Sequence, residues 1–190
     1  ASNRRVEALV GLDAFRELAA ERALVSQLSA SLKTPKDQLP ARIADLAASL
    51  KAAEKKIAQF EAKALEGRVP ALAASARTEG PYRLVAESIG TAASGDDVRS
   101  LALQVRERVG SGAVVALGAE VAGRAVVIVA TDETARTSGA KAGVLAKAAA
   151  AALGGGGGGR DDVAQGGGTD ASALPAALTA VVTALAATTA

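Results

Sequence analysis

A run of six consecutive glycines, Gly154–Gly159, constrains the fold of this chain more than any other feature. Glycine loses more backbone entropy than other residues when it is fixed, so such a run is not expected inside an ordinary helix or strand. Glycines are favoured where the backbone takes positive φ or where another surface approaches it closely. The run follows an alanine-rich helical segment and precedes Arg160, Asp161, Asp162 and Gln165. Two interpretations stay open: a contact surface, or a disordered linker.

The composition excludes several classes of site. The chain has no Cys and no His, so it has no disulfides, no thiolate or imidazole zinc site and no Ser-His or Cys-His nucleophile. We therefore expect no catalytic residue and no metal. The net charge of +2 is too small for broad attraction to DNA or to a membrane, so RNA binding would rely on a few placed groups. We see no signal peptide and no apolar run of about 20 residues, and we expect a cytoplasmic protein without membrane contact.

The first part of the chain predicts a helical arm, residues 12–79. Apolar residues recur at helical spacing from Leu12 to about Leu32, although Arg22 interrupts the stripe. After Thr34 and Pro35 a second helix carries a heptad seam. The seam residues are Leu39, Ile43, Leu46, Leu50, Ala53, Ile57, Phe60 and Ala64. We expect an antiparallel helical hairpin or coiled-coil arm, and packing within the chain and between two chains both stay open.

Gly80-Pro81 is the expected boundary to a globular domain, residues 80–190. The pattern beyond it predicts a strand, a helix capped near Ser94, a hairpin of two β-branched strands, a helix, a short extended piece and a final helix. The expected segments are Tyr82–Ile89, a helix to Val109, Ala113–Leu117, Ala125–Ala130, a helix from about Thr137 to Leu153, Val163–Gln165 and Ala173–Leu185. The fold class is therefore α+β, a helical arm followed by a small mixed-sheet α/β domain.

The chemistry of the glycine segment favours a contact surface over a catalytic site. It is not a P-loop, because no Gly-Lys-Ser/Thr follows, nor a dinucleotide motif, because it follows a helix. Exposed backbone amides, the guanidinium of Arg160 and the amide of Gln165 suit phosphates and sugar or base edges. Asp161 and Asp162 are interpreted as cap or turn residues. Arg136, Lys141 and Lys147 could add phosphate contacts, or could form a solvated helix face.

The segment Gly157–Gly167 resembles a signature of bacterial alanyl-tRNA synthetases. That signature reads Gly-Gly-Gly-Lys/Arg-x-Asp-x-Ala-Gln-Gly/Ala-Gly and lies near their C-terminus, in a domain that DHH-type phosphoesterases also carry. The opening Asn3–Ala8 resembles the Arg-Arg-Ile/Val-Glu-Ala end of the editing domain of these synthetases. This chain has Gly156 where the family often has a basic residue, and Asp161 where a Pro is common, which leaves more of the phosphate contact to Arg160.

The resemblance implies a non-catalytic, tRNA-binding C-terminal region. Residues 1–11 would end the preceding editing domain, and the globular domain would contact the outer corner of tRNA, in particular tRNA(Ala), and assist aminoacylation and editing. ATP and zinc would belong to other parts of the parent enzyme, so we expect no cofactor here. Whether the glycine segment is ordered without RNA stays open. The residues expected to bind RNA are Gly157, Gly158, Gly159, Arg160, Gln165, Gly167, Lys141 and Arg136.

Two other functions are compatible with parts of the sequence. Some members of the family self-associate through this region, so the alternative is a structural module that forms a homodimer through the arm. The arm residues that would carry it are Leu39, Ile43, Leu46, Leu50, Ile57 and Phe60. A phosphoesterase is a poor third, because the catalytic Asp-His-His motif is absent.

Overall fold

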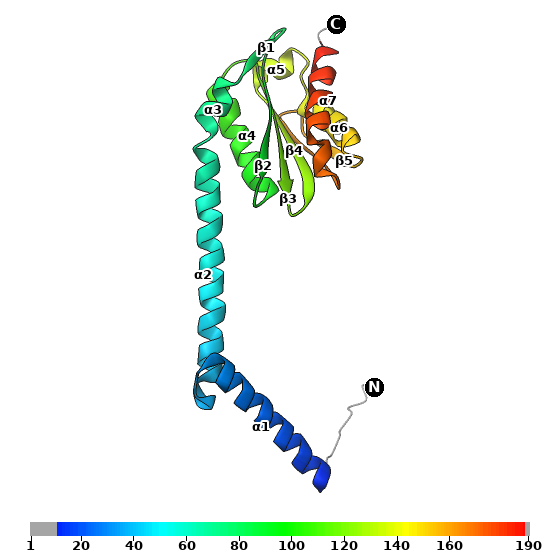
Figure 1. The fold of residues 1–190 in the computed structure, drawn as a ribbon. Helices are drawn as coiled ribbons and strands as arrows, with labels where there is room; N and C mark the ends of the chain where they lie inside the picture. The colour runs from blue at the N-terminus through cyan, green and yellow to red at the C-terminus, as the bar shows by residue number, and fades with distance from the viewer. Residues whose placement is uncertain (1–10, 189–190) are drawn as a thin grey trace, which may run out of the picture. The chain divides into compact units, whose positions relative to one another are not determined.

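The computed structural model describes residues 11–188 (Figure 1). The expected end of a preceding domain, residues 1–11, therefore lies outside the described residues except for Gly11. The chain forms two compact units, which meet in sequence between Lys56 and Ile57. Each unit is described separately below.

The first unit contains helix α1 (Leu12–Leu32), the short 3-10 helix η1 (Lys36–Gln38) and the first part of helix α2 (Leu39–Glu66). No residue of α1 is buried, and Leu39 is the buried residue of α2. Most large apolar side chains of both helices face solvent, as Phe15 does with 71% of its surface exposed. Both helices form as expected, but they do not pack as a hairpin within the chain. Arg22 interrupts the stripe of α1, which leaves too little continuous apolar surface for packing.

The second unit is built on a six-stranded mixed sheet. Its strands are β1 (Arg77–Glu79), β2 (Tyr82–Thr91), β3 (Ala113–Val121), β4 (Arg124–Thr131), β5 (Gly156–Gly159) and β6 (Val163–Gly168). They are ordered β1-β2-β3-β4-β6-β5. The β2–β3 pair is parallel and the other pairs are antiparallel. Helices followed by a mixed sheet confirm the α+β class.

Helices cover both faces of this sheet (Figure 1). One face packs against α3 (Val69–Ala74) and α4 (Gly95–Val109), and the other against α6 (Ala142–Ala152) and α7 (Leu174–Ala186). The short helices α5 (Glu133–Thr137) and η2 (Ala171–Ala173) complete the unit. In β3, Val114 faces the α6–α7 core and Val115 faces the α3–α4 core. Burial on both faces explains why the central strands read as continuous apolar runs.

Local signals placed several of these elements correctly. Ser94 caps α4, because its Oγ accepts a hydrogen bond from the backbone N of Asp97 at 3.1 Å. The β3–β4 turn has positive φ at Ala122 and Gly123, 49° and 77°, as a two-residue hairpin of type I′ requires. The helix expected from Thr137 to Leu153 is wrong at its start, because Gly139 takes φ of 105° after α5 and α6 begins only at Ala142.

The expected domain boundary falls within a strand pair. β1 pairs with β2 across Gly80 and Pro81, so the sheet begins at Arg77. The limits 12–79 for the arm and 80–190 for the globular domain stay a prediction.

Candidate nucleic-acid interface

The last four residues of the glycine run form an edge strand, β5 (Gly156–Gly159). β5 pairs antiparallel with β6, with Gly157 opposite Gly166 and Gly158 opposite Gln165. The expectation that the run could not be a strand is therefore wrong. The interpretation of the run as a disordered linker is wrong as well. Pairing with β6 on one side and packing against α6 offset the backbone entropy that these glycines lose.

Close packing against α6 requires glycine at several positions of this hairpin. A Cβ on Gly157 would lie 2.8 Å from Cβ of Ala150 and 2.9 Å from O of Ala146. A Cβ on Gly166 would lie 2.6 Å from the same carbonyl O of Ala146. Gly168 would meet the backbone of Leu153. Side chains at these positions would push helix and strands apart.

Two other glycines are not required by packing. A Cβ on Gly156 would meet no atom within 4 Å, and one on Gly158 would meet only Cε of Lys147, at 3.9 Å. Neither residue has positive φ. The absence of side chains at Gly156 and Gly158 therefore leaves the backbone of β5 open to close approach from outside.

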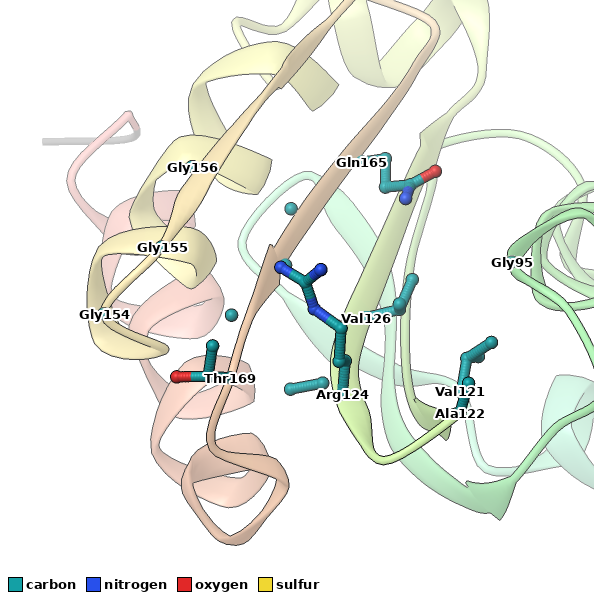
Figure 2. A pocket seen from close by; sticks show the side chains of 14 residues that line it. Gly95, Val121, Ala122, Arg124, Val126, Gly154, Gly155, Gly156, Gln165 and Thr169 are labelled. Carbon is teal, nitrogen blue, oxygen red and sulfur yellow. The ribbon is translucent and has the colours of Figure 1, made fainter.

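A hollow of about 710 Å³ lies beside this strand, over the part of the sheet that α4 does not cover. The start of β5, the end of β6, the β3–β4 turn and Gly95 at the start of α4 form it. Figure 2 shows the bare ribbon of Gly154–Gly156 on one side of the hollow and the β3–β4 turn on the other. Half of the residues that line it are glycines, which leave the backbone exposed there.

Arg124 and Gln165 extend polar side chains over this exposed backbone, and Thr169 also lines the hollow. Arg124 begins β4 and points its guanidinium towards the β6 ribbon, and Gln165 rises from β6 above it (Figure 2). Both side chains are exposed, and neither side chain makes a hydrogen bond or ion pair with another described residue. A Cβ on Gly95 would lie 3.9 Å from both Nε2 and Oε1 of Gln165. The hollow thus has a free cation and a free amide beside bare backbone.

Of the residues expected to bind RNA, Gln165 and Gly167 line this hollow, and Gly158 lies directly opposite Gln165 in the strand pair. Arg124 was missed by sequence reasoning. The turn signal at Gly123 was visible, but the sequence separates Arg124 from the glycines by about 30 residues. Register brings them together, because Ala125 pairs with Gly168.

The other expected cations lie at the opposite end of β6, around its connection to β5. Arg160 Nε lies 3.0 Å from Oδ1 of Asp162, and Lys141 Nζ lies 3.5 Å from Oδ2 of Asp161. Arg136 Nη1 donates to the carbonyl O of Thr131 at 3.1 Å. The expected site residues therefore divide between two ends of the hairpin.

The pKa of Asp162 reflects these cations. Burial acts to raise the pKa of its carboxyl, but the Arg160 guanidinium, the backbone N–H groups of Asp162 and Val163 and the charge of Arg136 hold it below its usual value. The carboxylate is therefore charged at neutral pH. The pairing of Arg160 with Asp162 balances the charge of this connection.

Two other features are absent from residues 11–188, a cluster of metal ligands and a membrane-spanning helix. Acidic residues nowhere gather there in groups of three or more that could hold a metal ion. The same residues contain no helix with the length and apolar character needed to cross a membrane.

Comparison with known proteins identifies a matching domain family, similar sequences and a similar solved structure. Residues 81–187 match the family model of the DHHA1 domain. Two similar proteins are the alanine–tRNA ligases of Leifsonia xyli subsp. xyli and Clavibacter michiganensis subsp. michiganensis. Each aligns with 97% of this chain at 59% sequence identity, and the aligned part is 21% of the length of each ligase. The crystal structure of the C-Ala domain from Aquifex aeolicus alanyl-tRNA synthetase matches 59% of this chain and 98% of that domain, with a TM-score of 0.54.

The structural match is 23% identical in sequence and shows the fold alone. The family model covers more than half of the chain, and the sequence similarity extends over nearly all of it. The chain therefore belongs to the DHHA1 domain family and is similar to the C-terminal region of bacterial alanyl-tRNA synthetases, as its glycine signature predicted.

Proposed function

We propose that this chain is the tRNA-binding C-terminal region of an alanine–tRNA ligase and that it contacts the outer corner of tRNA(Ala). The observation that carries the proposal is the hollow beside β5, where Arg124 and Gln165 stand free over a backbone floor. The similarity to alanine–tRNA ligases supports it.

The chemistry of the hollow suits folded RNA. Bare peptide groups at Gly156 and Gly167 let a ribose or a base approach at van der Waals distance. The guanidinium of Arg124 can donate two parallel hydrogen bonds to a phosphate, and the amide of Gln165 can donate and accept at a base edge. Shape and a few placed donors would account for binding by a chain whose net charge is only +2.

The role is that of a holding site and not of a reaction centre. By retaining the tRNA corner, this region would keep the acceptor end at high effective concentration near the aminoacylation and editing sites of the parent enzyme. ATP and zinc chemistry would remain in those other parts, and the cytoplasm is the compartment proposed. The contacts of Gly157, Gly159, Arg160, Lys141 and Arg136 with RNA belong to the same proposal.

A tRNA titration at low salt tests this function. We expect saturable binding that weakens as the salt concentration rises. Arg124→Ala should weaken binding further and should lower the slope of log affinity against log salt concentration by about 0.7–0.9. Arg108→Ala is the matched control, because Arg108 is exposed, without a partner, and lies at the far end of α4. A tRNA lacking its outer corner should bind far more weakly. Absence of tRNA binding in low salt, or equal loss with Arg124→Ala and Arg108→Ala, would contradict the proposal.

A second candidate function is self-association through the arm. Ile43, Leu46, Leu50, Ile57 and Phe60 share one heptad face of α2, and all are exposed. Burial of this face against a second copy would remove apolar surface from water. Sedimentation equilibrium tests it: a dimer should form in wild type and be lost in Leu46→Glu/Leu50→Glu. A monomer at all protein concentrations would remove this candidate.

A further inference from the structure

Three cations gather at the connection between β5 and β6, away from the hollow. Arg160 lies in the connection itself, Lys141 precedes α6, and Arg136 lies in α5. Lys141 pairs directly with Asp161 of the connection. Arg136 donates to the carbonyl O of Thr131, whose hydroxyl donates to the carbonyl O of Asp161. Their positive charges by themselves would attract phosphates more strongly than the single Arg124 of the hollow, but carboxylates lie beside them.

A carboxylate already occupies the guanidinium of Arg160. Its Nε lies 3.0 Å from Oδ1 of Asp162, and its Nη2 donates to Oδ2 at 3.2 Å. This is the two-point geometry by which arginine holds a phosphate. Arg160 is 84% exposed, so its side chain is open to solvent while one edge of its fork is taken. A phosphate that approached this edge would have to displace Asp162.

The backbone holds the competing carboxylates in place. The carbonyl O of Asp162 accepts from N of Thr131 at 2.9 Å, and that of Asp161 accepts from N of Ala142 at 3.0 Å and from Oγ1 of Thr131 at 2.7 Å. The connection is thus fixed to both β4 and the start of α6. Because the backbone is fixed, the carboxylates lose little further entropy when they pair with cations.

Lys141 is also paired with a carboxylate, that of Asp161, but at a longer distance than Arg160 from Asp162. Its Nζ lies 3.5 Å from Oδ2 of Asp161, and both side chains are more than half exposed. The Lys141–Asp161 pair is therefore the weaker of the two.

We propose that Asp161 and Asp162 compete with RNA phosphates for Lys141 and Arg160, and that this competition limits the affinity of the domain for RNA. The inference rests on the proposed tRNA binding and adds a determinant of its strength. It also distinguishes the connection from the hollow: the donors of the hollow are unpaired, whereas Arg160 and Lys141 must first leave a carboxylate before they can hold a phosphate.

A double-mutant cycle on Arg160 and Asp162 tests the inference by tRNA titration of the full chain. We expect Asp162→Asn to raise tRNA affinity about threefold or more and to steepen the salt slope by about 0.7–0.9, because one cation is released to a phosphate. In the Arg160→Ala background, Asp162→Asn should change little. Asp45→Asn, at an exposed position of α2, is the control for the same change in net charge.

The outcomes separate this inference from the proposed function. An unchanged affinity with Asp162→Asn, a gain equal to that of Asp45→Asn, or the same gain with and without Arg160 would overturn the inference alone. A wild-type chain that does not bind tRNA would overturn both. A parallel cycle of Asp161→Asn and Lys141→Ala, with a smaller expected gain, gives a second reading should Asp162→Asn disturb the connection, which thermal unfolding would report.

Discussion

At the scale of single residues, neighbouring glycines of β5 meet different constraints. Gly157 faces α6, where no side chain fits, whereas Gly158 faces open space opposite Gln165. The same residue type therefore serves packing at one position and an exposed backbone at the next. Alanine and valine substitutions distinguish these two uses.

Gly157→Ala should lower the free energy of unfolding by about 1–3 kcal/mol, because the new Cβ would meet Ala146 and Ala150 at less than 3.0 Å. Gly158→Ala is the control and should stay within about 0.5 kcal/mol of wild type. Urea unfolding measures both. Equal effects of the two substitutions would show that α6 does not set the glycine requirement.

Gly158→Val should weaken tRNA binding without a matching loss of stability. The branched side chain would stand on the open face of β5 beside Gln165 and keep RNA from the backbone. Titration with tRNA alongside thermal unfolding checks this. Unchanged affinity in a folded Gly158→Val variant would mean that RNA does not approach this strand.

The Arg160–Asp162 pair predicts a pH dependence of stability. Because the folded state lowers the pKa of Asp162, the pair stabilises the fold above the unfolded pKa of about 3.9 and loses its effect as the pH falls through the lowered folded pKa. Asp162→Asn should cost about 0.2–1 kcal/mol at pH 7 and nothing once wild-type Asp162 is protonated. Urea unfolding across this pH range measures the difference. A cost that stays constant into acid would exclude the ion pair as its source.

At the scale of elements, the stability of α4 depends on an N-cap that the sequence predicts at Ser94. Ser94 Oγ accepts from N of Asp97, and Val98 begins the buried stripe of the helix. Ser94→Ala should lower the free energy of unfolding by about 1 kcal/mol, because the N–H of Asp97 loses its partner. Ser100→Ala, at an exposed position inside the same helix, is the control and should be near neutral. Thermal unfolding compares them, and equal stabilities would contradict the role of the cap.

At the scale of the whole molecule, the two units have unequal cores. α1 buries no residue, whereas the sheet unit has apolar cores on both faces. Helices without buried partners are marginal in water, so arm helicity should fall gradually before the sheet unit unfolds. Tyr82, the single Tyr of a chain without Trp, is buried in the sheet unit and reports on it alone. Circular dichroism at low protein concentration should therefore begin to change at a lower temperature than Tyr82 fluorescence. Coincident transitions would indicate that the arm is stabilised by contacts beyond those described.

Local sequence patterns were sufficient to predict several elements of the fold. The sequence predicted the cap at Ser94, the buried stripe of α4 and the turn at Gly123. Capping, helical periodicity and turn formation all involve residues close together in the chain, so local patterns reveal them. The glycine signature also indicated the family correctly.

The conformation of the glycine run depends on long-range contacts. Glycine has no side chain to mark a strand, so pairing with β6 and packing against α6 made Gly156–Gly159 an edge strand where local propensity predicted none. The same long-range register brought Arg124 to the hollow and left Arg160 at the other end of β6 with Asp162. Strand pairing joins residues that are distant in the chain, and that is why the composition of the run could not locate the site.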